Sequence, residues 1–160
     1  MVDKNQAMVD YLNACPLIQN NPLYFNFINA KNDNKQIITL TNEKALAKTY
    51  IDGSVLKQYS LAIVDFKSLA YKPIVKSAGY SDENVEDMLS VQQIIDWIDA
   101  QNEAHNYPNF GASCVIEEIS ATSDNPMLDG IDTSISPALV QYSITIVVTY
   151  LDTSKVIWGN

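Results

Sequence analysis

The residue types that carry out catalysis are few in this chain, and they do not cluster in the sequence. The single histidine, His105, has no nucleophile-elbow pattern to accompany it, so we expect a surface residue near the end of a helix. The five glycines are scattered and form no phosphate-binding loop. Cys15 and Cys114 lie too far apart for zinc-ligand spacing; we expect reduced thiols, and the sequence gives no support for a disulfide between them. The sequence therefore predicts no enzyme active site, no metal site and no cofactor.

Acidic residues come close together in two segments, and a structural role is the simpler interpretation of both. Asp124, Asp129 and Asp132 do not follow the EF-hand spacing for calcium, and turn formation explains them. Glu86 and Asp87 lie in the first turns of a predicted helix, where the helix dipole favours negative charge. Neither segment predicts a metal site or an acid–base pair.

Charge is distributed unevenly along the chain. The net charge is -9, and all ten basic residues are lysines. Residues 1–76 hold nine lysines against six acids, whereas residues 77–160 hold only Lys155 against thirteen acids. An acidic surface without arginine repels phosphates, so we do not expect sequence-specific nucleic-acid binding.

Length and composition favour one ordinary domain. The chain has 160 residues, of which 47% are hydrophobic, so it can bury a single core, and we expect one domain over residues 1–160. No stretch approaches the roughly 20 apolar residues of a membrane span, and the first residues lack the pattern of a secretion signal. We therefore expect neither membrane insertion nor secretion.

The N-terminal half predicts one helix and several short strands. Met8, Tyr11, Leu12 and Cys15 fall on one face of an amphipathic helix over about residues 3–14, which Pro16 ends. The runs 24–28 and 37–40 are rich in aromatic and β-branched residues, which is typical of strands. The dipeptide Asp52-Gly53 favours a tight hairpin between residues 46–51 and 55–66.

The C-terminal half predicts a long helix and two further strands. After a connection over residues 69–81, Ser81 is the expected N-cap of a helix over about residues 82–104. Its apolar stripe consists of Met88, Val91, Ile95 and Ile98, with Ile94 alongside. A strand follows at 115–119, then a turn-rich loop over 122–137, and the last strand alternates strictly from Tyr142 to Tyr150. The predicted fold is an α+β domain, mainly an antiparallel β-sheet flanked by two main helices.

Trp97 does not belong to the apolar stripe of the long helix and lies on the side of Gln93. Two interpretations stay open. A second layer such as a loop buries the indole, or the indole is exposed for a partner, a role in which tryptophan is common. The loop over 122–137 is longer than most connections, and such loops are often functional or become ordered on assembly.

The order of these pieces resembles a known family. A short N-terminal helix precedes a hairpin around Tyr50-Ile51-Asp52-Gly53, and an acidic helix ends in Trp97-Ile98-Asp99-Ala100-Gln101-Asn102. The segments that follow are Asn106-Tyr107-Pro108-Asn109-Phe110, the Asn125-to-Asp132 loop and the final strand from Tyr142 to Tyr150. From about residue 5 to 152, the chain resembles the tail terminator (tail completion, or minor capsid) proteins of long-tailed bacteriophages of Gram-positive hosts.

The resemblance implies a sheet flanked by helices that assembles as a hexameric ring. Such a ring caps the completed tail tube, stops its polymerisation and presents a surface to the head-tail connector or neck protein; in a contractile tail it also meets the sheath. The implied location is the head-proximal end of the virion tail, after assembly in the host cytoplasm. DNA would pass through the ring without specific binding. A headless tail-like bacteriocin particle would use the same part.

Three hypotheses assign residues to this role. First, Glu86 and Asp87 belong to an acidic surface that lines the bore and repels passing DNA. Second, Gln93 and Trp97 contribute to the contact between subunits. Third, the segments 69–81 and 122–137 dock on the tube or on a neighbour and become ordered on assembly. The candidate docking residues are Lys72, Lys76, Asp124, Asp129 and Asp132.

Two other classes of protein compete with this interpretation, and a more distant third is an enzyme, in which only His105 could be a general base. A different head-tail connector or neck subunit would share the small size, the acidity and the ring. A small-ligand-binding domain would stay monomeric or dimeric and show a ligand-dependent melting shift.

Overall fold

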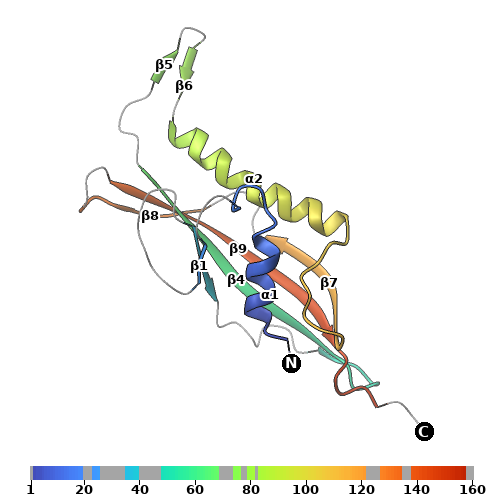
Figure 1. Ribbon diagram of the computed structural model, residues 1–160. Helices are drawn as coiled ribbons and strands as arrows, with labels where there is room; N and C mark the ends of the chain where they lie inside the picture. The colour runs from blue at the N-terminus through green and yellow to red at the C-terminus, as the bar shows by residue number, and fades with distance from the viewer. Residues whose placement is uncertain are drawn as a thin grey trace.

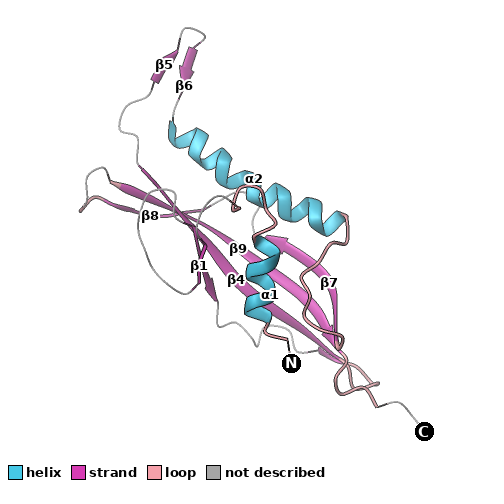
Figure 2. Ribbon diagram, in the orientation of Figure 1, coloured by secondary structure: helices cyan, strands magenta, loops and turns pink. Residues whose placement is uncertain are grey.

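The computed structural model describes residues 2–19, 23–25, 35–39, 48–68, 74–76, 79–81, 83–121, 127–134 and 138–157. It confirms an α+β fold with a mainly antiparallel sheet and two helices (Figures 1 and 2). The elements are α1 (Lys4–Leu12), β1 (Leu23–Phe25), β2 (Lys35–Thr39), β3 (Lys48–Thr49), β4 (Val55–Ser68), β5 (Ile74–Lys76), β6 (Gly79–Ser81), α2 (Glu83–Glu103), β7 (Cys114–Ala121), β8 (Met127–Asp132) and β9 (Leu139–Asp152).

The sheet is built on two long central strands. β4 and β9 each have 14 residues and pair antiparallel in one unbroken register, from Val55 opposite Asp152 to Ser68 opposite Leu139. At roughly 3.3 Å per residue, this pair is about 45 Å long. The 21-residue helix α2 is only about 30 Å long, at 1.5 Å per residue. A single helix of this length cannot cover the whole sheet.

Each central strand has an interrupted strand on its outer side. β7 and then β8 run in the same direction along β9, the first opposite residues 146–152 and the second opposite residues 139–143. β2 and β3 do the same along β4. β1 adds a parallel strand outside β2, the one departure from antiparallel pairing among the described strands.

Both helices lie over one face of the sheet (Figure 2). The main core lies between the helices and this face. Leu61 and Ile63 of β4 point to this face, opposite Ile146 and Ile144 of β9. The even-numbered residues of β9 from Tyr142 to Tyr150 are all buried, which confirms the predicted alternation. On the other face, a smaller cluster consists of Val64, Phe66 and Leu139.

A buried ion pair lies on the helix-bearing face of β4. Asp65 and Lys67 are 1% and 8% exposed, and the lysine Nζ is 3.8 Å from the Asp65 Oδ2. They share a face because side chains two apart on a strand point the same way. A charged pair at this depth interrupts an otherwise apolar face, and removing one partner would leave the other charge buried.

The predicted apolar face is confirmed: Met8 and Leu12 of α1 and Cys15 beyond its end are fully buried, and Tyr11 is half-buried. The helix begins after Asp3, whose carboxylate accepts hydrogen bonds from the backbone N–H groups of Asn5 and Gln6.

In α2, the predicted stripe is confirmed for Val91, Ile95 and Ile98, with Ile94 beside them, and wrong for Met88, which is exposed. Met88 lies near the start of α2, and the buried residues described for this helix lie further along, from Val91 to Ile98.

The predicted hairpin at Asp52-Gly53 is confirmed. Lys48 and Thr49 of β3 pair with the start of β4, and Gly53 has a φ of +89°, a conformation that favours glycine. The turn is closed by a hydrogen bond from the Tyr50 N–H to the Ser54 carbonyl.

Two predicted connections are wrong in part. Residues 74–76 and 79–81 form a small antiparallel hairpin, so Lys76 and Ser81 lie on strands and Ser81 is not the N-cap. Residues 127–132 form β8 rather than part of a loop, so Asp129 and Asp132 lie on a strand paired with β9. In both segments, pairing with a second strand outweighs the local turn preference of glycine, proline and aspartate.

Candidate functional site

The junction of the two helices is held by an aromatic contact. The rings of Tyr11 in α1 and Trp97 in α2 lie 5.3 Å apart, centre to centre, and are tilted by 53°. The Tyr11 hydroxyl donates to the Asn106 carbonyl at 3.0 Å, just beyond the end of α2. Burial raises the pKa of Tyr11 well above its ordinary value, and the nearby Tyr107 adds to this. Tyr11 therefore ties α1 both to α2 and to the segment that follows it.

The end of α2 is a Schellman motif centred on His105. This residue has a φ of +53°; its N–H donates to the Asn102 carbonyl, and the Asn106 N–H donates to the Gln101 carbonyl. His105 is exposed, and its Nδ1 lies 3.1 Å from the Tyr107 hydroxyl. The expectation of a surface histidine at a helix end is confirmed.

The segment after α2 covers the outer edge of β7. An extra residue, Glu117, forms a β-bulge in this strand, and its carbonyl accepts a hydrogen bond from the Tyr107 hydroxyl at 3.2 Å. The Asn102 side chain accepts from the Ile119 N–H at 3.0 Å. These contacts occupy backbone groups that an edge strand would otherwise offer to another chain.

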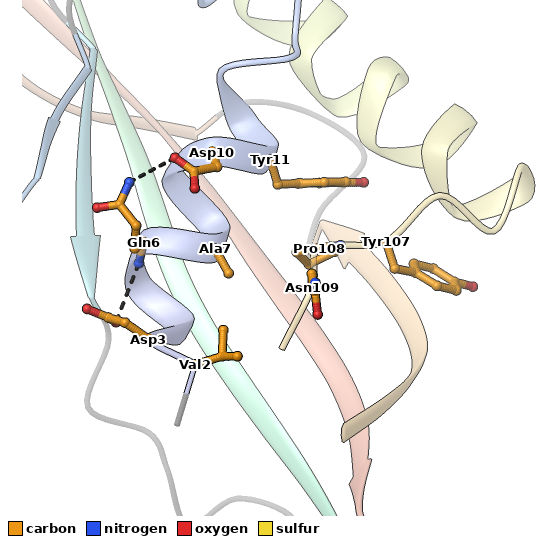
Figure 3. Close-up of a pocket in the computed structure, with 9 residues that line it drawn as sticks. All are labelled: Val2, Asp3, Gln6, Ala7, Asp10, Tyr11, Tyr107, Pro108 and Asn109. Carbon is orange, nitrogen blue, oxygen red and sulfur yellow. Dashed lines mark hydrogen bonds between the residues drawn. The ribbon is translucent and has the colours of Figure 1, made fainter. Parts of the chain in front are cut away.

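A pocket of about 420 Å³ opens between α1 and the segment 107–109 (Figure 3). We call it the α1 pocket; its lining residues are Val2, Asp3, Gln6, Ala7, Asp10, Tyr11, Tyr107, Pro108 and Asn109. Val2, Ala7 and Pro108 contribute apolar surface, while Asp3 and Asp10 make the rim acidic. The Gln6 side chain donates to Asp10 at 2.8 Å. No lysine lines this pocket.

Below the α1 pocket, Phe110 packs edge-on against Tyr59 of β4 and Tyr150 of β9. The Tyr59 hydroxyl donates to the Asn5 side chain, which fastens the start of α1 to the sheet. Burial, with a smaller contribution from the negative charge of Asp3, raises the pKa of Tyr59 to about 12. The Lys4 ammonium lies over the rings of Phe110 and Tyr150.

A second feature is an exposed tip at one end of the sheet, made of residues 48–54 and 153–157, which we call the hairpin tip. The backbone N–H of Ile157 donates to the Asp52 carbonyl at 3.2 Å, so the two segments lie together. A Cβ on Gly53 would stand 2.5 Å from the Lys155 carbonyl oxygen, which shows how closely they pack. Ile51 is fully exposed and Ile157 is 81% exposed.

Next to the hairpin tip, a salt bridge joins the two central strands. The ammonium of Lys57 lies 2.5 Å from the Asp152 carboxylate, which also accepts from the Ser154 N–H. The hydrogen bond from Lys57, and to a smaller extent those from Ser154, hold the pKa of Asp152 well below its usual range. The Asp152 carboxylate in turn raises the pKa of Lys57. This pair fixes the register where the tip begins.

A third feature is the opposite end of the sheet, where apolar side chains of β8 are uncovered. Leu128 and Ile131 point to the helix-bearing face, opposite Tyr142 and Val140, yet they are 51% and 50% exposed. Met88 and Leu89, near the start of α2, are also exposed. Figure 1 places β8 and the start of α2 at the same end of the molecule, with the β5–β6 hairpin beyond them. We call Leu128, Ile131, Met88 and Leu89 the apolar end.

The residues proposed for a subunit contact have different environments. Trp97 is half-buried and packs against the core through Tyr11, in agreement with the interpretation that a second layer covers it. Gln93 is exposed on the same helix. Glu86 and Asp87 lie in the first half of α2, and their side chains are outside the described residues, so their assignment to a bore stays a prediction.

The docking-loop candidates are spread over two parts of the chain. Lys76 is on β5 and Asp129 is on β8, but their side chains fall outside the described residues. Lys72 and Asp124 lie outside the described residues altogether. The Asp132 carboxylate is exposed and accepts hydrogen bonds from the Ser134 hydroxyl and N–H, which lower its pKa. Asp132 therefore closes a turn after β8, as predicted from its turn-rich segment.

Among the described residues, no three His, Cys, Asp or Glu side chains come together as a metal site, and no helix is long and apolar enough to cross a bilayer. Cys15 and Cys114 are in the thiol form, and no disulfide joins them. A scan against protein-family models finds no match, and no curated protein is significantly similar to this chain.

The α1 pocket and the hairpin tip were not found from the sequence. The tip was predictable as a turn, but its contact with residues 153–157 joins segments about a hundred residues apart. The pocket also joins two segments about a hundred residues apart, residues 2–11 and 107–109. The segment 106–110 was singled out only through the resemblance, and its physical role is to join α1, α2 and β7.

Proposed function

We propose that this chain is a structural subunit of a bacteriophage tail, a tail terminator that forms a ring and caps the tail tube. The ring would be hexameric, would stand at the head-proximal end of the virion tail, and would join the tube to the head-tail connector. The sequence resemblance motivates the family, and the surfaces of the molecule support a role in assembly rather than in catalysis.

The observation that carries the proposal is the apolar end. Leu128 and Ile131 lie on the face that elsewhere buries the core, but α2 is too short to cover the full length of the sheet. Half-exposed leucine and isoleucine side chains on an ordered strand offer surface that a partner can bury. We assign the apolar end to the tube protein.

The acidic character of the chain fits the same role. Residues 77–160 carry thirteen acids and one lysine, and such a surface repels the phosphates of DNA that passes through a ring. The proposal therefore includes passage of DNA without specific binding and without catalysis. Whether the tail is contractile, and so whether a sheath protein is also a partner, does not affect the test.

The test is electron microscopy of the purified full chain, alone and mixed with the tail tube protein of the same phage. We expect rings from the protein alone and capped tubes of defined length from the mixture. The double variant Leu128→Asp, Ile131→Asp should form the same rings but leave tubes uncapped. Its matched control is Val115→Asp, since Val115 is equally exposed on β7 but belongs to the other face of the sheet.

Wild-type protein that leaves tube length and tube ends unchanged would refute the proposal. So would turnover or tight binding of a small molecule by a strictly monomeric species.

A second candidate function, small-ligand binding, is favoured by the volume of the α1 pocket, which falls in the usual range for ligand sites of about 300–1,000 Å³. A ligand-dependent rise in melting temperature that Asp10→Lys abolishes would support it. Both rim carboxylates, Asp3 and Asp10, are exposed, and exposed charges suit contact with an oppositely charged surface better than the precise recognition of a small ligand. We therefore prefer the assembly role.

A further inference from the structure

The fold gathers positive charge and exposed apolar surface at the hairpin tip. Lys155 is the only basic residue in the acidic half of the chain, and contact with the turn at Asp52 and Gly53 brings it to the same end of the sheet as Lys48. The Lys48 ammonium lies over the Tyr50 ring, 5.3 Å from its centre. Asp52, the one acid of the tip, keeps its negative charge, because hydrogen bonds from the Ser54 hydroxyl and N–H lower its pKa, so two lysines against one acid leave a net charge of +1. The tip is therefore an apolar projection with a positive balance on a strongly acidic protein.

The α1 pocket has the complementary character. Its apolar walls are formed by Val2, Ala7 and Pro108, and its rim carries the carboxylates of Asp3 and Asp10 with no lysine among the lining residues. Its volume of about 420 Å³ is ample for one or two aliphatic side chains. Figure 3 shows the pocket open between α1 and residues 107–109, and Figure 1 shows the hairpin tip beyond the N-terminus of α1, at the lower end of the sheet.

We propose that the hairpin tip of one copy docks into the α1 pocket of the next copy. Ile51 enters between α1 and Pro108, and the lysines of the tip face the two carboxylates of the rim. Because tip and pocket are different surfaces, the contact is head-to-tail, and repetition of such a contact closes a ring when the rotation between copies allows it. The inference rests on the proposed function, for which it supplies the contact between subunits.

At the outer edge of β7, the structure favours side-chain docking over strand addition. The outer edge of β7 is occupied at Glu117 and Ile119 by the Tyr107 hydroxyl and the Asn102 side chain of the same chain. A neighbouring strand therefore cannot pair there without displacing the end of α2. The α1 pocket lies along that same segment, where Asn109 is exposed and Tyr107 is half-buried.

The test uses one variant for each surface in the full chain, studied by sedimentation velocity and native mass spectrometry over a range of concentrations. Ile51→Asp removes the apolar projection, and Asp10→Lys reverses charge at the pocket rim. Both side chains are exposed, so both variants should keep the wild-type melting temperature at concentrations where all three proteins are monomeric. We expect each variant to associate at least tenfold more weakly than wild type, and added salt to weaken the wild-type contact.

Asp96→Lys is the matched control for the pocket variant. Asp96 is an exposed helix residue that accepts a hydrogen bond from the glutamine four positions before it, as Asp10 does, but it lies outside the pocket. It should assemble as wild type.

Mixing the two surface variants in equal amounts gives the sharpest result. Each variant retains the surface that the other lacks, so the mixture should form dimers with one intact contact and nothing larger. Wild-type assembly by either variant, an Asp96→Lys defect as large as that of Asp10→Lys, or a mixture without dimers would overturn the docking of tip into pocket.

The outcomes separate the two proposals. Rings that persist in both variants and still cap tubes would refute only the docking contact. A docking contact that behaves as expected, in rings that leave tubes uncapped, would refute only the tail terminator function. A wild-type chain that stays monomeric at every concentration would refute the contact directly.

Discussion

Trp97 offers the most informative single perturbation, because the sequence left two roles open for it and the structure assigns it a partner within the chain. Its indole lies 5.3 Å from the Tyr11 ring and packs beside the core. Truncation of a fully buried aromatic residue to alanine costs about 3–5 kcal/mol. Trp97 is half-buried, so we expect Trp97→Ala to lower the free energy of unfolding by about 2 kcal/mol.

A double-mutant cycle isolates the contact itself. Urea unfolding of wild type, Trp97→Ala, Tyr11→Ala and the double variant should give a coupling energy of about 1 kcal/mol, the usual value for a tilted aromatic pair. Tyr11→Phe keeps the ring and removes the hydrogen bond to Asn106, which should cost about 1 kcal/mol by itself. Gln93→Ala is the control on the exposed side of α2 and should change stability by less than about 0.5 kcal/mol.

The same variants distinguish packing within the chain from a contact between subunits. Unfolding should be measured at two protein concentrations, because a subunit contact makes stability depend on concentration. A coupling energy near zero would refute the reasoning that Trp97 holds α1 on α2. If Trp97→Ala and Gln93→Ala instead weaken association with no loss of monomer stability, the residues act at the interface, as the sequence-based hypothesis stated.

Two further predictions follow from the backbone and from the buried tyrosines. His105→Gly should raise the free energy of unfolding by about 1 kcal/mol in thermal or urea unfolding, because a non-glycine residue at a φ of +53° is strained. The variant should assemble as wild type. A loss of stability would contradict the Schellman assignment. Stability should fall as pH rises from about 10 to about 12, since the pKa of Tyr59 is near 12 in the folded chain and about 10 in the unfolded chain, so the unfolded state loses its proton first. Tyr59→Phe should reduce this loss, measured as urea midpoints across the pH range, and an unchanged pH profile would show that Tyr59 does not titrate as stated.

Local sequence patterns were sufficient to predict a buried face where that face follows from the periodicity of a single element. The 3.6-residue spacing of α1 and the strict alternation of β9 each define a buried face without knowledge of any partner, and both faces are buried as expected. The turn at Asp52-Gly53 is similar, because the positive φ of Gly53 is a property of the dipeptide.

The same patterns failed where a β-bulge changes the phase of a strand. In β8, the register shifts between Leu128 and Gly130, which brings Leu128 and Ile131 to one face although they are three residues apart. Two apolar residues three positions apart with Asp-Gly between them are typical of a turn, so the sequence predicts a loop here. β7 contains a second bulge at Glu117, with Ile116 and Ile119 brought to the core face in the same way. Only pairing with β9 reveals either bulge, because the extra residue is defined by the strand opposite it.

The sequence by itself determined the class of fold, the buried face of the last strand and the uneven charge, since these depend on composition and on periods within single elements. Tertiary structure alone decided which distant segments meet. It placed Lys155 beside the Asp52-Gly53 turn, Tyr11 against Trp97, and Tyr107 on the bulge of β7. The physical reason is that such contacts result from the packing of several elements at once, and no local preference of the chain encodes them.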